Sequence, residues 1–414
     1  MGRVLSTALA RARVLCAVAT LTGASQAVGA TDFQFSLDAR LVDSDGRKSF
    51  LEGGLGTLRF GSDQSGLQLG RLRLALDQPI GQILTVHLDA SSWGDHEKNP
   101  IDLTEAFLEL RPYPHSGFRA RLKGGAFYAP ISLENRLAGW ESPYTLSYSA
   151  LDSWIAEELR TIGLEGSLEW LGTRLGHDFD VALTGAVFGW NDPAGVALAN
   201  HGFALQDRQT GLFERIGQPG AVPVRGFEVF HEIDGRPGFY EGLEVRYLDR
   251  IVLRALHYDN QADPGALDAP EHRFAWRTRF NTAGVRFDGD QGWSAILQWL
   301  DGQTYLEPVE NLYLEWVFDT RYALLSKHFG HHTLSVRYDD FAVVSHNASP
   351  SGNQQGHAFT AAYIFEPSTH WRFTLEWLSV HSTNANRQIY YGEAPLATES
   401  ALTLAVRYAL GAHR

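Results

Sequence analysis

Three basic side chains alternate along a short segment of the chain, where Arg119, Arg121 and Lys123 are separated by Ala120 and Leu122. Side chains two positions apart point to the same face of an extended strand, so these three cations are expected to form one row. A row of cations concentrates anions and sets the charge selectivity of a pore. The same alternation predicts further inward-facing cations at Arg273, Arg277, Arg279, Arg337, Arg372 and Arg407.

Carboxylates in the neighbouring segments give these cations a second interpretation. Glu105 and Glu109 precede the row, Glu165 and Glu169 follow it, and within each pair two carboxylates would share a strand face. Opposite charges that face each other across adjacent strands stabilise a sheet and cancel each other's field. The sequence therefore leaves both anion guidance and structural charge pairing open.

Other reactive residue types lack the partners that catalysis or metal binding requires. His328, His331 and His332 are closely spaced, but no Cys or carboxylate completes a ligand set. Ser345 and His346 are adjacent in sequence without a third member, and no Gly-x-Ser-x-Gly motif occurs. The net charge of −13 argues against nucleic acid as a partner. We therefore expect no enzyme activity, no metal site and no cofactor.

The elements that would position these residues are strands of about ten residues, the length that crosses a bilayer at a tilt. In the first, Phe33, Phe35 and Leu37 alternate with Gln34 and Ser36. This reading predicts sixteen strands, at residues 33–41, 67–76, 82–91, 103–111, 118–128, 160–170, 178–190, 241–248, 251–258, 273–287, 293–300, 312–324, 332–341, 357–365, 371–380 and 400–410.

The connections between these strands alternate between short and long. The short ones include residues 77–81, 111–117, 171–177, 249–250, 288–292 and 366–370, and the long ones include residues 41–66, 129–159, 191–240, 342–356 and 381–399. A transmembrane barrel with both termini in the periplasm needs short periplasmic turns and long external loops. The predicted fold class is therefore all-β, a transmembrane antiparallel β-barrel of about sixteen strands.

The N-terminus has the pattern of a secretory signal peptide. Arg3, Arg11 and Arg13 precede an apolar run, and small residues lead to Ala30. The predicted organisation is a cleaved signal peptide at residues 1–30 and a barrel domain at residues 31–414. The single cysteine, Cys16, would be removed with the signal peptide. The 41 glycines and 49 aromatic residues (23 Phe, 15 Tyr, 11 Trp) are typical of strands and interfacial girdles.

Two long connections are candidates for the interior of the barrel. Residues 129–159 are rich in aromatic and apolar side chains, which suits a loop that folds inward and narrows a channel rather than one surrounded by water. The alternative is an external loop that covers the mouth. Residues 191–240 are long enough to supply a plug. A plugged structural or adhesive barrel, and a barrel enzyme, are the two alternatives to an open channel.

One part of the chain resembles a known family. Residues 124–135 (GGAFYAPISLEN) and 160–166 (RTIGLEG) are similar to the fifth strand, the constriction loop and the sixth strand of the phosphate-selective porins. The resemblance implies a sixteen-stranded homotrimeric porin of a Gram-negative outer membrane, with Pro130, Glu134, Asn135 and Arg136 in the constriction loop. The family's best-known members have lysines near Ala126 and Tyr128, so phosphate selectivity does not follow.

The expected function is a water-filled channel for the diffusion of small hydrophilic solutes, with a preference for anions. The expected partners are outer-membrane lipid and lipopolysaccharide, the barrel insertion machinery and the transported solutes. A homotrimer, in which this chain associates with two further copies of itself, is expected from the family resemblance alone.

Overall fold

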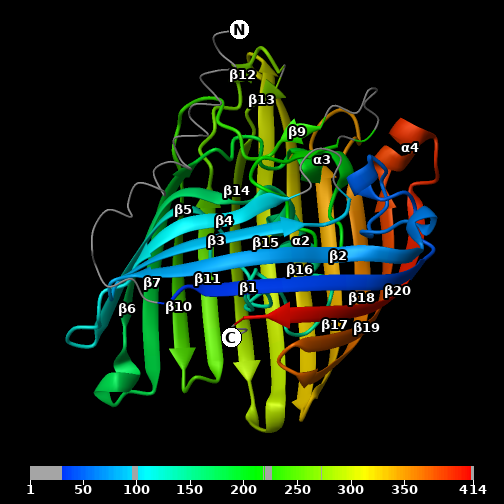
Figure 1. Ribbon diagram of the computed structural model, residues 1–414. Coiled ribbons are helices and arrows are strands. Elements are labelled where there is room, and N and C mark those ends of the chain that lie inside the picture. The colour runs from blue at the N-terminus through cyan, green and yellow to red at the C-terminus, as the bar shows by residue number, and fades with distance from the viewer. Residues whose placement is uncertain (1–29, 96–100, 218, 220–225, 272, 412–414) are drawn as a thin grey trace.

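Sixteen antiparallel strands form a closed barrel, in which the first strand pairs with the last (Figure 1). The computed structural model describes residues 30–95, 101–217, 219, 226–271 and 273–411. The predicted fold class and strand count are confirmed. The predicted signal peptide lies almost entirely outside the described residues.

The strands of the barrel each match one predicted segment. They are β1 (Asp32–Ser44), β2 (Gly66–Ile80), β3 (Leu84–Ser92), β4 (Asp102–Leu110), β5 (Phe118–Phe127), β6 (Thr161–Trp170), β7 (Phe179–Gly189), β10 (Gly238–Tyr247), β11 (Ile251–Asp259), β14 (Arg277–Asp288), β15 (Trp293–Val309), β16 (Leu312–Phe329), β17 (His332–Ser345), β18 (Gln354–Ser368), β19 (Trp371–Asn384) and β20 (Leu396–Leu410).

The connections contain short elements of their own. Two ribbons pair β8 (Arg215–Ile216) with β9 (Phe227–Glu228) and β12 (Leu267–Asp268) with β13 (Arg273–Phe274). The α-helices are α2 (Ala150–Glu158), α3 (Val196–His201) and α4 (Ala385–Tyr391), and the 3-10 turns are η2 (Phe50–Glu52), η3 (Ser62–Gln64), η4 (Gly172–Leu175) and η5 (Asp290–Gly292). Within the described ranges, no helix has the length and apolarity needed to cross a membrane.

Alternating side chains explain why these segments are strands of a barrel wall. In β1, Leu37 and Leu41 are exposed on the outside, whereas Asp38 and Arg40 are buried inside. The outer side chains form an apolar surface, and Trp293 and Trp371 lie on it at the short-turn ends of their strands. This pattern matches the outer face of a barrel surrounded by lipid.

Connection lengths depart from the predicted alternation at one place. β15 and β16 are joined only by Glu310 and Asn311, at the end of the barrel where the other connections are long. These two strands have 17 and 18 residues. At the long-connection end of the barrel, these two strands therefore extend the wall in place of a long loop. Asn311 takes the positive φ of 66° that a tight turn requires.

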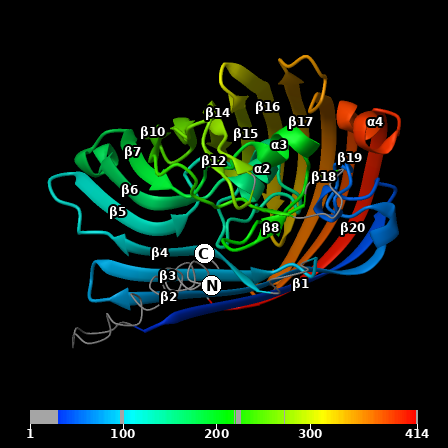
Figure 2. The ribbon, with the colours of Figure 1, turned by 90° about the horizontal axis from the view of Figure 1, so that it is seen from above.

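The interior of the barrel contains an apolar core. Trp154 of α2 is 2% exposed, and its ring lies 4.9 Å from that of Phe318 on β16 and 5.5 Å from that of Phe280 on β14. α2 and α3 lie inside the ring of strands when the molecule is viewed from above (Figure 2). The inner face of the barrel around Phe280 and Phe318 is therefore covered by apolar side chains and does not border water.

That core makes the predicted orientation of two arginines wrong. Thr278 and Phe280 point inward, so Arg277 and Arg279, which alternate with them, lie on the outer face of β14. The prediction assumed that polar side chains face the lumen and apolar side chains face lipid. Because the lumen beside β14 is filled with aromatic side chains, the alternation has the opposite sense there. Arg273 was also predicted in the wall, but it lies on β13, in a ribbon outside the barrel strands.

Candidate functional site: the charged interior of the barrel

The basic row of β5 borders a cavity of about 380 Å³ inside the barrel. Arg119, Arg121 and Lys123 alternate with Ala120 and Leu122, and the latter two side chains point outward. Strands β6, β7, β10 and β11 complete the wall of this β5 cavity, to which they contribute Glu165, Ser167, Glu169, Ala182, Thr184, Gly242, Glu244, Arg246, Arg254 and Leu256.

Two carboxylates of β6 pair with this row. Glu169 forms an ion pair with Arg119. Glu165 lies 3.7 Å from Arg121 Nη2 and 3.8 Å from Lys123 Nζ, and it accepts a hydrogen bond of 2.5 Å from the Tyr240 hydroxyl. Two carboxylates are therefore shared among three cations. The geometry therefore has features of both interpretations of the row. The cations pair with carboxylates, as structural charge pairing requires, but three cations face two carboxylates, which leaves positive charge for anion guidance.

Two further cavities continue from the β5 cavity, one after the other. One of about 400 Å³ shares Lys123, Tyr128 and Arg254 with it, and one of about 480 Å³ shares Arg73 and Leu137 with the second. The third is bordered by short-turn residues of β16–β19. We call the three together the vestibule, which occupies the short-turn half of the interior.

Basic side chains outnumber acidic ones around the vestibule. The acidic residues that border it are Asp77, Glu105, Glu141, Glu165, Glu169, Glu244 and Glu366, and the basic residues are Arg73, Arg111, Arg119, Arg121, Lys123, Arg136, Arg246, Arg254, Arg286, Arg372 and Arg407. This excess stands out because the whole chain carries a net charge of −13. Some of these arginines also pair with carboxylates outside the lining, including Arg73 with Asp89, Arg246 with Asp180, Arg286 with Asp288 and Arg407 with Asp38. The excess therefore belongs to the side chains that face the cavities, where confined cations concentrate anions.

Residues 128–160, which we call the inner loop, fold into the barrel above the vestibule. Its backbone N–H groups donate to side chains of the opposite wall, from Leu133 to Gln298 at 3.1 Å and from Ala150 to Asp339 at 3.0 Å. Tyr128 packs flat on Trp140, with ring centroids 4.2 Å apart. The predicted inward fold of this loop is therefore confirmed, and α2 is its last part.

The four predicted constriction residues have different surroundings. Pro130 and Asn135 border the vestibule, and the amide atoms of Asn135 have no hydrogen-bond partner in the described part of the chain. Arg136 also borders the vestibule; it is exposed and lies 3.7 Å from Asp288. Glu134 is fully buried and pairs with Arg337 at 3.3 Å, so it anchors the loop rather than bordering water.

The predicted inward cations outside β5 also differ in role. Arg372 and Arg407 border the vestibule. Arg337 does point inward, but it is 1% exposed and its Nε donates to Asp339 at 2.8 Å. Its Nη2 donates to the Tyr148 carbonyl oxygen at 2.8 Å. Arg337 therefore fastens the inner loop to β17.

A second connection crosses the interior above the inner loop. Residues 201–214, which we call the crossing segment, start beside β18 and β19, where the His201 carbonyl oxygen accepts from Asn384 at 2.8 Å. They pass the β1–β2 connection, where Leu205 N donates to the Thr57 carbonyl oxygen at 2.9 Å. They reach β4, where Leu212 N donates to the Leu103 carbonyl oxygen at 2.8 Å. Part of the long 191–240 connection thus lies inside the barrel, where the plug considered from the sequence would lie.

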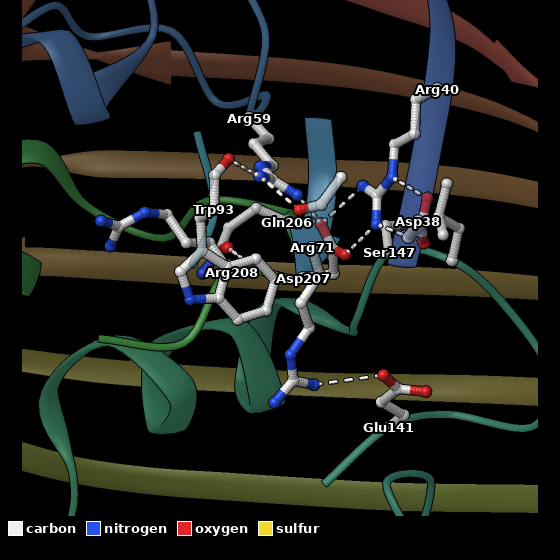
Figure 3. A network of polar contacts seen from close by, with 12 residues as sticks. Asp38, Arg40, Arg59, Arg71, Trp93, Glu141, Ser147, Gln206, Asp207 and Arg208 are labelled. Carbon is white, nitrogen blue, oxygen red and sulfur yellow. Dashed lines mark hydrogen bonds and ion pairs between the residues drawn. The ribbon is translucent and has the colours of Figure 1, made fainter. Parts of the chain in front are cut away.

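Two adjacent residues of the crossing segment, Asp207 and Arg208, have opposite charges and bind different partners. Figure 3 shows the partners of Asp207. Asp207 binds Arg40 of β1 and Arg59 of the β1–β2 connection, and Arg208 binds Asp95 and Glu214. Burial raises the pKa of Asp207, but the two arginines outweigh burial and hold that pKa well below its usual range. Asp207 is therefore a permanent anion inside the barrel.

The sequence patterns do not single out Arg40, Arg59, Asp207 or Arg208 as functional residues. The available signal was the set of polar residues that alternate with apolar ones in the first predicted strand, which includes Asp38 and Arg40. Arg40 and Asp207 are 167 residues apart, and no spacing rule connects them.

Ser345 and His346, the adjacent pair noted in the sequence, have separate partners. Ser345 Oγ donates to the Ser349 carbonyl oxygen at 3.1 Å, and His346 pairs with Glu315. Among the described residues, one acidic group has ligand atoms within 4.8 Å of one another, namely Asp192, Glu232 and Asp234. The Asp192 carboxylate accepts from the backbone N–H groups of Ile233 and Asp234, which accounts for its position.

Solved structures of outer-membrane proteins are similar to this barrel in fold. No protein-family model matches the chain, and no curated protein matches its sequence. Among solved structures, the outer membrane channel DcaP of Acinetobacter baumannii is 10% identical, with a TM-score of 0.54 over 92% of this chain and 97% of that one. A loop L8 deletion mutant of OmpT, an outer membrane protein of Vibrio cholerae, is 8% identical, with a TM-score of 0.52 over 92% and 99%.

A third structure, Salmonella typhi OmpF in complex with daunomycin, is 11% identical, with a TM-score of 0.51 over 92% of this chain and 97% of that one. At these identities the likeness concerns the fold alone. The chain has the fold of porin-like outer-membrane barrels.

Proposed function

We propose that this protein is an outer-membrane channel that passes small hydrophilic solutes and prefers anions. One observation carries the proposal: a vestibule with an excess of basic side chains inside a chain of net negative charge. Charges in a confined passage with low-dielectric walls act more strongly on a solute than exposed charges do.

The location follows from the barrel itself. Its apolar outer face, with tryptophans at the short-turn end, suits a bilayer, and outer membranes of Gram-negative bacteria contain barrels of this kind. A signal peptide at residues 1–30 would export the chain. The partners that we propose are membrane lipid and lipopolysaccharide, the insertion machinery and, by family resemblance, two further copies in a homotrimer.

A passive channel fits better than an enzyme. Ser345 and His346 do not contact each other through their reactive atoms, as catalysis by such a pair would require. The competing candidate is a plugged structural barrel, which the crossing segment favours because it occupies the interior above the vestibule.

Conductance in planar bilayers tests the proposal. We expect purified protein to give stepwise ohmic current in KCl, and a variant lacking residues 203–210 to give larger steps. A salt gradient should give a reversal potential of anion-selective sign. If neither the full chain nor the deletion variant conducts, the channel function is wrong and the plugged structural barrel takes its place.

A further inference from the structure

The carboxylate of Asp207 occupies a cradle formed by two arginines (Figure 3). Arg40 Nη1 lies 3.0 Å from Oδ1, Arg40 Nη2 lies 2.5 Å from Oδ2, and Arg59 Nη1 lies 3.0 Å from Oδ1. A planar guanidinium that donates two parallel hydrogen bonds matches the geometry of any carboxylate. The cradle therefore has the chemistry of a carboxylate-binding site.

The wall holds the cradle in place independently of Asp207. Arg40 Nε donates to Asp38 at 3.2 Å, and both residues belong to β1. Arg59 Nη2 donates to the Gly70 carbonyl oxygen at 2.8 Å and to the Trp93 carbonyl oxygen at 3.2 Å. Because these contacts come from β1, β2 and the end of β3, the arginines would keep their orientation if Asp207 left.

The cradle also has an unused donor. Arg59 Nε is buried and has no hydrogen-bond partner among the described residues. Asp207 satisfies only part of the donor set, so a ligand with a further acceptor atom would gain a contact that Asp207 does not make. An unpaired buried donor carries a desolvation penalty that such a ligand would remove.

Asp207 lies at a junction between small cavities. A cavity of about 20 Å³ and another of about 40 Å³ both have Asp207 and Leu146 in their walls. The smaller one shares Arg372 and Arg407 with the vestibule, and the larger one extends to Phe60 of the β1–β2 connection. The Asp207 side chain therefore separates the vestibule from the loop end of the barrel. The two small cavities are lined by arginines and by the carboxylates Asp38, Glu141 and Glu376.

Exchange of one carboxylate for another avoids the main penalty of breaking a buried ion pair. Removing one partner leaves an uncompensated buried charge, which is strongly unfavourable. If a solute carboxylate takes the place of Asp207, Arg40 and Arg59 stay paired throughout. Asp207 would be released on the loop side, where it can be hydrated.

We propose that Arg40 and Arg59 form a carboxylate-binding site for the transported solute, and that Asp207 is an internal mimic that the solute displaces. This inference rests on the proposed channel function and adds a solute class, small organic carboxylates. Displacement frees the crossing segment from β1 and joins the cavities on either side. The channel is then open for a small fraction of the time without its solute and for a larger fraction with it.

Substitution of chloride by acetate at equal ionic strength tests the proposal in planar bilayers. We expect acetate to raise the open fraction of the wild-type channel, and Asp207→Asn to be open in chloride already and to lose the acetate response. The expected change is about tenfold or more, the factor that corresponds to one charge-assisted hydrogen bond. Arg40→Gln should also lose the response, whereas Asp43→Asn, on the outer face of the same strand, should behave as the wild type.

A reversible lock gives a second measurement that does not depend on charge. Leu58 and Leu205 form an isolated bridge between the β1–β2 connection and the crossing segment. Cα atoms paired in this way are about 5 Å apart, within the range that a disulfide spans. We expect oxidised Leu58→Cys/Leu205→Cys protein to ignore acetate and to respond again after reduction.

The outcomes separate this inference from the channel function. If the deletion of residues 203–210 conducts but acetate leaves the wild-type open fraction unchanged, the carboxylate site is wrong and the channel function stands. An acetate response that persists in the oxidised lock, or in Arg40→Gln, also overturns the site. If no variant conducts, the channel function and this inference fail together.

Discussion

Glu157 of α2 and His201 of α3 form a buried ion pair, with Glu157 Oε1 2.9 Å from His201 Nε2. It joins the inner loop to the start of the crossing segment. The neighbouring Glu158 accepts from the backbone N–H groups of Ala197 at 2.7 Å and Leu198 at 3.1 Å. Two consecutive carboxylates of α2 thus hold α3, and both contacts depend on protonation.

We predict that the crossing segment is held more firmly at pH 5 than at pH 8. Burial, with Glu157 nearby, raises the pKa of Glu158 to about 7. Burial lowers the pKa of His201, but Glu157 outweighs it and raises that pKa above its usual value. Both groups bind a proton more readily in the folded protein than in the unfolded chain. Their contribution to the stability of the folded state is therefore complete at low pH, and it is lost as the pH rises through the raised pKa values of Glu158 and His201.

Conductance measured from pH 5 to pH 8 checks this prediction. We expect it to increase as the pH rises from the ordinary pKa of a glutamate, 4.5, toward the raised pKa of about 7, and to change less above the raised pKa values. Glu158→Gln mimics the protonated carboxyl group and should weaken the pH dependence. Asp207 stays ionised over this range because its pKa is lowered, so it does not contribute. Equal conductance at both ends of the range would contradict the prediction.

The basic row of β5 should control charge selectivity. Replacing Arg119, Arg121 and Lys123 together by Gln removes three of the cations around the vestibule, so the reversal potential in a salt gradient should shift toward cation preference. The shift should be larger at low salt, where screening is weaker. Arg279→Gln is the matched control, because this cation lies on the outer face of β14. A shift of equal size in the control would sink the assignment.

The apolar core inside the barrel should contribute strongly to stability. Trp154→Ala removes a side chain that is 2% exposed and contacts Phe280 and Phe318, and we expect the free energy of unfolding in detergent to fall by about 3–5 kcal/mol. Trp299→Ala on the outer face, where the side chain is 43% exposed, should have a smaller effect. If the two variants lost equal free energy of unfolding, the apolar core inside the barrel would contribute no more to stability than the outer face does.

Gly195 should be required for α3 to lie against the barrel wall. It has φ of 95°, and a Cβ there would lie 2.2 Å from Thr304 Oγ1. Gly195→Ala should therefore displace α3 and increase both conductance and protease cleavage of the crossing segment. Gly235→Ala has a similar positive φ of 77° but open space around it, so it isolates the backbone cost of about 1 kcal/mol. Identical behaviour of the two variants would contradict the steric argument.

Local patterns determined the architecture. Alternation within segments such as residues 33–41 and 371–380, together with the lengths of the connections, predicted all sixteen strands, and the structure confirms them. These signals are local because strand geometry fixes which side chains share a face. The same local signals predicted that residues 129–159 fold inward, since their apolar content is unfavourable in water.

The sense of the alternation and the pairing of distant charges were decided only by the tertiary structure. Alternation states that Phe280 and Arg279 face opposite sides, but not which side is the interior, and here the aromatic core around Trp154 draws Phe280 inward. Arg40 meets Asp207 because the crossing segment spans the barrel, although 167 residues separate them in sequence. A buried charge takes the partner that the closed barrel brings within hydrogen-bond distance, and sequence spacing does not encode that distance.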